Sequence, residues 1–210
     1  MIKKGIEIAK QKIPVSQKLA APQTRAANIH KKGPDYVEST GFVYLLLDSS
    51  GSMADGQKLS QAKGGALKFA KDAIAEGYRV GLIKFGSDAF HLCDPKRILS
   101  SLESSLNAME AYGSTNMAAA INLANQKLSD KGPVRYMVIA TDGFPDNQQF
   151  TLDAARQAKR NGVEIITVGT DDADKDFLRK LATRTDFVIK VQRDQFEKAI
   201  ASTAKMLPGK

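Results

Sequence analysis

Residues 42–52 read FVYLLLDSSGS, an apolar run that ends in an aspartate and a series of serines. The six apolar residues before Asp48 are typical of a strand buried within a sheet. A second run, YMVIA at residues 136–140, leads in the same way to Thr141 and Asp142. Ligands of open α/β sheets gather at the carboxyl ends of the strands, where the strand order reverses. The two runs therefore predict a buried sheet with Asp48 and Asp142 at one crevice.

Segments of helical and of extended periodicity alternate through the rest of the chain. We expect strands over residues 42–47, 79–85, 90–93, 134–141, 163–168 and 187–191, and helices over residues 58–75, 95–109, 116–128, 148–160, 174–181 and 195–206. This alternation predicts an α/β fold with a doubly wound, mostly parallel six-stranded sheet and helices on both faces. Strands 79–85 and 90–93 are too close in sequence for a crossover helix, so we expect one antiparallel edge strand.

Asp48, Ser50 and Ser52 alternate along the chain directly after the first predicted strand. An extended or gently curved loop turns alternate side chains to the same side, and Gly51 permits a sharp bend between the serines. By itself, a segment rich in serine and glycine before a helix is also typical of an ordinary turn. The three side chains become informative only together with the polar segments that follow.

A second polar segment, Gly-Ser-Thr at residues 113–115, precedes the helix expected at residues 116–128. Thr115 is thus predicted at a helix start, where a threonine hydroxyl either caps the helix or reaches a metal ion. The complete order of strands, helices and polar segments is much harder to obtain by chance than any one segment. Five oxygen-bearing side chains are then available to one hard cation: Asp48, Ser50, Ser52, Thr115 and Asp142.

Over about residues 41–208, these segments resemble the metal-ion-dependent adhesion site of von Willebrand factor type A domains, in particular those of intracellular bacterial type. All five positions of the family's metal motif match. The resemblance implies that Ser50 and Ser52 bind the cation directly, and that Thr115 binds it directly or through water. It also implies that Asp48 and Asp142 act largely through water or as hydrogen-bond acceptors. The fold and the antiparallel edge strand expected here also match that family.

The types of ligand favour magnesium, with manganese as the alternative. Hydroxyl, carboxylate and water oxygens suit these ions, whereas the absence of histidine and cysteine near the motifs argues against zinc. Calcium usually takes more than two carboxylates. Only Asp55 follows the serines as a further acid, so we predict a single metal ion.

Three neutral hydroxyls and two mostly indirect carboxylates leave a divalent cation incompletely neutralised, so it is expected to take one more anionic oxygen. In the family this ligand is a Glu or Asp of a partner protein, which implies a metal-dependent interaction module, or adaptor. For intracellular members of bacterial type, the partner is often an AAA+ ATPase or an assembly of kinases and phosphatases. Phe144, next to Gly143, either anchors a partner or packs within its own loop.

Positive charge is concentrated at the start of the chain. Residues 1–34 hold eight lysines and arginines and one glutamate, a net charge of +7 out of the +8 carried by all 210 residues. We therefore divide the chain into a basic N-terminal extension, residues 1–36, and a von Willebrand factor A-like domain, residues 37–210. Apolar residues spaced four, three and four apart within residues 2–13 predict a short amphipathic helix in the extension.

Two other functions fit parts of the sequence. The basic extension could hold nucleic acid through its lysines, but no aromatic residue precedes Tyr36 to stack on bases. Asp48 with nearby hydroxyls and Asp142 superficially resembles a metal-dependent aspartyl phosphotransferase. Position 50 is serine instead of the second aspartate common in that class, and no GxSxG, P-loop or dinucleotide-binding pattern is present. We therefore expect a binding protein and no enzyme.

The cellular compartment is predicted from what the sequence lacks. Cys93 is the single cysteine, which excludes an internal disulfide and fits a reducing compartment. No segment is as long and apolar as a transmembrane helix, and residues 1–6 lack the apolar core of a signal peptide. These features predict cytoplasmic localisation without a membrane span.

Overall fold

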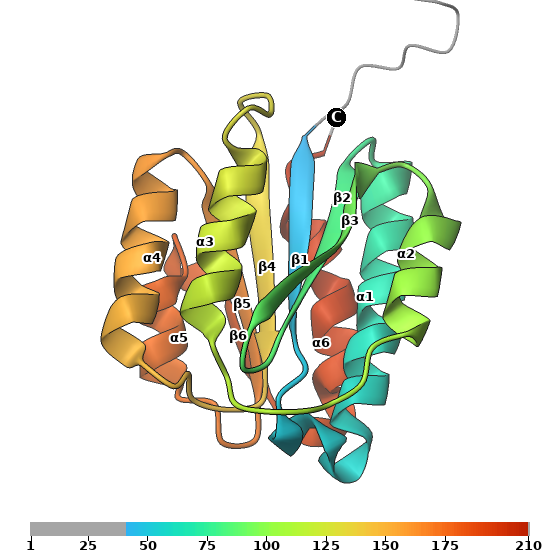
Figure 1. The fold of residues 1–210 in the computed structure, drawn as a ribbon. Coiled ribbons are helices and arrows are strands. Elements are labelled where there is room, and N and C mark those ends of the chain that lie inside the picture. The colour runs from blue at the N-terminus through green and yellow to red at the C-terminus, as the bar shows by residue number, and fades with distance from the viewer. Residues whose placement is uncertain (1–40, 210) are drawn as a thin grey trace, which may run out of the picture. The chain divides into compact units, whose positions relative to one another are not determined.

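Strand β1 (Phe42–Asp48) lies within a six-stranded sheet of order β3-β2-β1-β4-β5-β6. The computed structural model describes residues 41–209 (Figure 1). The other strands are β2 (Arg79–Phe85), β3 (Ala89–Lys96), β4 (Arg135–Thr141), β5 (Glu164–Thr170) and β6 (Val188–Val191). Strands β2 and β3 pair antiparallel, and all other neighbours pair parallel. The predicted mostly parallel sheet with one antiparallel edge strand is therefore confirmed.

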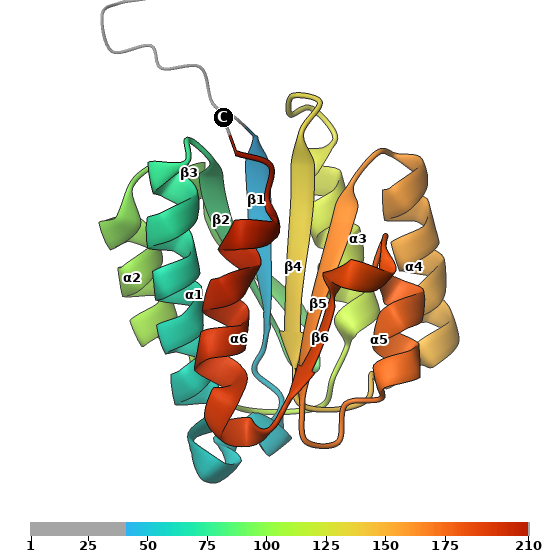
Figure 2. The same cartoon turned by 180° about the vertical axis from the view of Figure 1, so that it is seen from behind.

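Helices cover both faces of the sheet (Figures 1 and 2). One face carries α1 (Lys58–Ala75), α2 (Leu99–Asn107) and α6 (Phe196–Ser202), and the other carries α3 (Met117–Leu128), α4 (Gln148–Arg160) and α5 (Lys175–Leu181). Short 3-10 turns join them at Gly51–Gln57, Thr185–Phe187, Arg193–Gln195 and Thr203–Met206. Each face of the sheet has its own hydrophobic cluster.

The apolar run of β1 is continuous because the sheet is covered on both sides. Val43, Leu45 and Leu47 pack into the cluster with α1 and α6, whereas Tyr44 and Leu46 pack into the cluster with α3 and α4. All five side chains are fully buried. Burial of each such side chain contributes roughly 1.5–3 kcal/mol, so packing on both faces fixes the strand that leads to the polar motif.

The strand order reverses between β1 and β4. The connection that leaves β1 runs through α1 on one face, and the connection that leaves β4 runs through α4 on the other. The carboxyl ends of these two strands therefore open into the crevice where ligands of such sheets bind. Asp48 is the last residue of β1, and Asp142 follows the last residue of β4.

The region after β2 departs from the sequence-based prediction. The edge strand expected at residues 90–93 is longer and runs through Pro95, while the helix expected at residues 95–109 begins only at Leu99. Proline is tolerated at this position because one side of an edge strand makes no ladder hydrogen bonds. The pairing of β2 with β3 also shifts register near Leu82, which is a common way to bend an edge strand.

The last helix is also shorter than predicted, because α6 ends at Ser202 and the chain continues as a 3-10 turn. The Ser202 hydroxyl donates to the Ala199 carbonyl, and the Thr203 hydroxyl donates to the Ile200 carbonyl, each at 2.7 Å. Such side-chain bonds to nearby carbonyls compete with regular helical hydrogen bonding. Within residues 41–209, no helix combines the length and apolar character needed to cross a membrane.

The N-terminal extension and its predicted amphipathic helix lie outside the described residues. The division of the chain at residue 36 therefore stays a prediction. The site predicted from the sequence lies entirely within the part that the structure describes.

Candidate metal centre

Asp48 is a fully buried carboxylate that joins β1 to β4. Its Oδ1 accepts a hydrogen bond from the Ser50 backbone N–H (2.8 Å), and its Oδ2 accepts one from the Thr141 hydroxyl (2.6 Å). Burial raises the pKa of Asp48 to about 6, although these hydrogen bonds act to lower it. Both carboxylate oxygens are thus engaged within the protein, which fits an indirect role behind a cation better than direct ligation.

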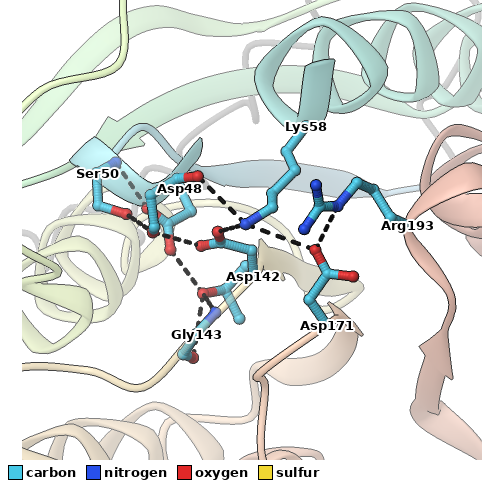
Figure 3. A network of polar contacts seen from close by, with 9 residues as sticks. Asp48, Ser50, Lys58, Asp142, Gly143, Asp171 and Arg193 are labelled. Carbon is cyan, nitrogen blue, oxygen red and sulfur yellow. Dashed lines mark hydrogen bonds and ion pairs between the residues drawn. The ribbon is translucent and has the colours of Figure 1, made fainter. Parts of the chain in front are cut away.

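The two serines link Asp48 to Asp142 (Figure 3). The Ser50 and Ser52 hydroxyl oxygens are 3.1 Å apart, and the Ser52 hydroxyl donates to Asp142 Oδ1 at 2.9 Å. A 3-10 turn begins at Gly51, and the Met53 N–H donates to the Ser50 carbonyl (3.0 Å). This turn brings the two hydroxyls together, as predicted, but the extended or gently curved loop expected here is wrong, because Ser52 lies within the 3-10 turn.

The Gly-Ser-Thr loop is hydrogen-bonded to the first motif. The Gly113 carbonyl accepts the Gly51 N–H (2.9 Å), and the Tyr112 N–H donates to the Ser49 carbonyl (2.7 Å). Gly113 adopts a φ of +83°, and an added Cβ would lie 2.3 Å from the Ser87 hydroxyl oxygen, so the loop requires glycine here. Backbone hydrogen bonds therefore hold this loop against the serine motif.

The same loop is hydrogen-bonded to the segment after β4. The Thr115 N–H donates to Asp146 Oδ1 (2.9 Å), and the Asp146 N–H donates to the Thr115 carbonyl (3.0 Å). The three polar segments predicted from the sequence thus converge at one edge of the sheet.

Thr115 does not cap α3, so that alternative is wrong. The helix begins at Met117, and its N-cap is Asn116, whose side-chain oxygen accepts the Ala119 N–H at 3.2 Å. Asparagine is as good a cap as threonine and lies one residue closer to the first helical turn. Within residues 41–209 the Thr115 hydroxyl makes no hydrogen bond, which leaves its oxygen available to a cation or to water.

Lys58 also lies in this site, a placement that the sequence analysis did not predict. It is the first residue of α1 and is only 4% exposed. Its ammonium donates to Asp142 Oδ2 (2.7 Å) and to the Ser52 carbonyl (3.2 Å). Burial alone would lower the pKa of Lys58, but the hydrogen bond and the charge of Asp142 outweigh it, so the pKa is raised. Lys58 therefore carries a positive charge next to Asp142.

Asp171 and Arg193 form an ion pair beside Lys58 (Figure 3). Asp171 follows β5, and its Oδ2 lies 3.5 Å from the Lys58 nitrogen. The Arg193 Nε donates to the same oxygen at 2.7 Å. Asp171 directly follows β5 as Asp142 directly follows β4, and this is the sequence signal that could have identified it.

The donor set fits a hard cation. Among residues 41–209, no group of three or more histidine, cysteine, aspartate or glutamate side chains could hold a metal ion, so a site here depends on hydroxyls. Ser50, Ser52 and Thr115 supply those hydroxyls, and two buried carboxylates stand with them. Hydroxyl and carboxylate oxygens suit magnesium or manganese.

Two aromatic side chains near these loops are exposed. Phe144, which follows Gly143, is 49% exposed to solvent. Tyr112, which precedes Gly113, is 83% exposed. Loop packing thus leaves Phe144 half uncovered. Both rings are accessible to a partner molecule that reaches the site.

The fold and this crevice define an open-sheet α/β domain with a candidate cation site at the point where the strand order reverses. A profile of the von Willebrand factor type A domain matches residues 43–202. The chain therefore belongs to the von Willebrand factor type A domain family. Domains of this family are commonly modules for metal-dependent adhesion or protein interaction, and their metal-ion-dependent adhesion sites bind divalent metals.

Solved structures of the family share this fold. The von Willebrand factor domain of the type V pili tip protein Mfa5 from Porphyromonas gingivalis has a TM-score of 0.69 at 13% identity, covering 79% of this chain and 94% of that chain. Proximal thread matrix protein 1 from the mussel byssus, with a zinc-occupied adhesion-site motif, has a TM-score of 0.65 at 15% identity, covering 80% and 46%. At these identities the likeness shows the fold alone.

The match to curated relatives covers only part of each relative. The UPF0353 protein of Mycolicibacterium gilvum (strain PYR-GCK) is 29% identical over 145 residues, which cover 60% of this chain and 43% of that protein. The chain spans less than half the length of the curated relatives it matches.

Proposed function

We propose that this chain is a magnesium-dependent interaction domain that binds an acidic side chain of a partner protein. Ser50, Ser52 and Thr115 would hold the ion through their hydroxyl oxygens, and Asp48 and Asp142 would accept hydrogen bonds behind them. When bound, Mg²⁺ supplies a Lewis-acidic position for a carboxylate oxygen. The proposed partner is a cytoplasmic AAA+ ATPase or an assembly of kinases and phosphatases that presents a Glu or Asp.

The observation that carries this proposal is the unbroken series of contacts from Asp48 through Ser50 and Ser52 to Asp142. Both carboxylates are buried, and their like charges repel one another. Among residues 41–209, Lys58 offsets one of these charges, and no cationic side chain pairs with the other. A divalent cation held by the adjacent hydroxyls would offset the remainder, which is the ordinary condition for a buried carboxylate to stay ionised.

The geometry supports binding over phosphotransfer. Lys58 supplies the lysine that such an enzyme needs and that the sequence did not indicate. Asp48, however, has each carboxylate oxygen engaged by an internal donor, Ser50 or Thr141, at 2.8 Å or less. A carboxylate nucleophile needs one oxygen directed at the reacting atom. We therefore assign no catalytic residue.

Binding of Mn²⁺, followed by electron paramagnetic resonance, tests the site assignment. We expect one Mn²⁺ per chain, displaced by excess Mg²⁺, and an affinity lower by roughly 10- to 100-fold in Asp48→Ala, because Asp48 fixes the serine loop. Asp55→Ala is the matched control, since Asp55 is an exposed aspartate of the same loop. Equal Mn²⁺ affinity in Asp48→Ala and in the wild type would show that the site lies elsewhere.

A pull-down from the native host's lysate, with Mg²⁺ and with EDTA, tests the partner. We expect a protein that is retained only with Mg²⁺ and only by the chain with Asp48 intact. Retention that is indifferent to both contradicts the proposal. Deleting residues 1–34 tests the alternative of a nucleic-acid-binding arm separately: nucleic-acid affinity that survives the deletion rules that arm out.

A further inference from the structure

Lys58 shares its partners with the proposed metal site. Its ammonium lies 2.7 Å from Asp142 Oδ2 and 3.2 Å from the Ser52 carbonyl oxygen, so it occupies the same small group of oxygens. The side chain is nearly completely buried. A lysine is seldom buried unless acids compensate it, so its charge here is tied to the carboxylates of the site.

The local backbone places Lys58 there. Gly56 and Gln57 both adopt left-handed conformations, with φ of +56° and +63°, and turn the chain directly into α1. The Arg193 side chain lies against Gly56, where an added Cβ would be 2.2 Å from its Nη1. Arg193 in turn pairs with Asp171, whose carboxylate lies 3.5 Å from Lys58 (Figure 3). The turn at Gly56 and Gln57 thus fixes the backbone of Lys58, and the carboxylates of Asp142 and Asp171 fix its ammonium.

The position of Lys58 changes the net charge of the proposed metal site. By formal charge, the two carboxylates of Asp48 and Asp142 count −2 and the Lys58 ammonium counts +1, so these three side chains sum to −1 without metal. The Asp171–Arg193 pair adds nothing to this sum. A divalent cation changes the charge to +1, whereas the same centre without Lys58 would become neutral. The fixed ammonium thus opposes the metal ion and favours an additional anion.

We propose that Lys58 is a built-in counter-cation that couples metal binding to binding of an acidic ligand. It lowers the affinity for a divalent metal alone, and it raises the affinity of the metal-loaded site for a carboxylate. Metal and carboxylate then bind cooperatively, and by thermodynamic linkage each strengthens the other by the same factor. This inference rests on the proposed metal-dependent interaction, and it assigns to Lys58 a role in selecting acidic partners.

The test compares the wild type with Lys58→Met, which keeps the length of the side chain and removes its charge. Mn²⁺ affinity is measured by electron paramagnetic resonance in chloride buffer, first alone and then with increasing acetate as the carboxylate probe. We expect Lys58→Met to bind Mn²⁺ alone about tenfold more tightly than the wild type. Acetate should raise the Mn²⁺ affinity of the wild type and raise that of Lys58→Met several-fold less.

Three controls separate charge from structure. Lys58→Arg keeps the positive charge and should retain the weak Mn²⁺ binding and the strong acetate effect of the wild type. Lys71→Met removes an exposed lysine of the same helix and should change neither quantity. Lys58→Gln, a polar neutral substitute, should behave as Lys58→Met does, and it replaces that variant if methionine impairs folding, which circular dichroism reports.

The outcomes distinguish this inference from the proposed function. A wild type that binds Mn²⁺, with neutral Lys58 variants of equal affinity and equal acetate effect, overturns the coupling and leaves the metal site intact. Wild-type and Lys58→Met chains that both fail to bind Mn²⁺ overturn the proposed function and this inference together.

Discussion

The ends of β4 and β5 each lead to an aspartate, but the two carboxylates have different surroundings. Asp142 is buried and contacts the Ser52 hydroxyl and Lys58. Asp171 is partly exposed and accepts a hydrogen bond from Arg193 at 2.7 Å. Position after a buried strand therefore does not by itself make a candidate metal ligand.

The two aspartates differ in whether a nearby cationic side chain already balances the negative charge around them. Asp171 has Arg193 as its own cation, so a metal ion there would compete with an existing pair. Asp142 pairs with Lys58 but also repels Asp48, for which residues 41–209 supply hydrogen bonds and no ion pair. Buried carboxylates with too few cations are the ones that gain most from a metal ion.

The largest expected effect comes from Asp142→Ala in metal-free protein. The substitution leaves the Lys58 ammonium buried, and Asp171, at 3.5 Å, is then its one remaining ion-pair partner among residues 41–209. Removing one partner of a buried ion pair typically costs about 3–5 kcal/mol of unfolding free energy, and urea denaturation in EDTA measures the loss. Asp55→Ala, which removes an exposed acid, should cost less than about 0.5 kcal/mol.

A double variant sharpens this test. Asp142→Ala with Lys58→Met removes both charges, so it should recover much of the stability that Asp142→Ala loses. A double variant as unstable as Asp142→Ala alone would show that lost packing, and not the unpaired ammonium, causes the effect.

The next effect is a dependence of stability on pH that originates in Asp48. Its pKa is raised to about 6 in the folded chain from an ordinary value of 3.8. A carboxyl whose pKa is raised on folding stabilises the fold below about pH 4, and that contribution is lost as the pH rises through 6. In EDTA, ionisation of Asp48 should lower the unfolding free energy by about 3 kcal/mol as the pH rises from 4 to 7.

Urea denaturation from pH 4 to pH 7 measures this term when the wild type is compared with Asp48→Asn, which cannot ionise. The wild type should lose more stability with rising pH than the variant does, and Mg²⁺ should restore it at pH 7. Parallel pH profiles for the two chains would show that burial does not raise the pKa of Asp48.

The sequence predicted the elements whose signals are local. The apolar runs before Asp48 and Asp142 indicated the buried strands, and the short spacing between the strands predicted at residues 79–85 and 90–93 indicated an antiparallel pair. The helix expected from residue 95 was wrong because Pro95 is compatible both with a helix start and with an edge strand. Only the pairing with β2 decides between them.

The candidate site was predicted as far as its motifs extend. The structure brings the two serines and Asp142 into contact, while their role as metal ligands stays a prediction. Lys58 could not be predicted, because a lysine at a helix start usually points to solvent. Its direction depends on two successive left-handed residues, and the second is Gln57, a residue type that gives no such signal.

The smallest expected effect comes from Asp171→Asn, and it tests the comparison most directly. Asp171 has a φ of +46°, a conformation that asparagine tolerates, so the substitution removes charge without adding backbone strain. Arg193 is itself substantially exposed, and ion pairs of this kind contribute about 0–1 kcal/mol. Mn²⁺ affinity should therefore fall less than about threefold, against at least roughly tenfold for the matched Asp142→Asn. Equal losses in the two variants would place Asp171 among the metal ligands. The ion pair with Arg193 would then not explain why the ends of β4 and β5 differ.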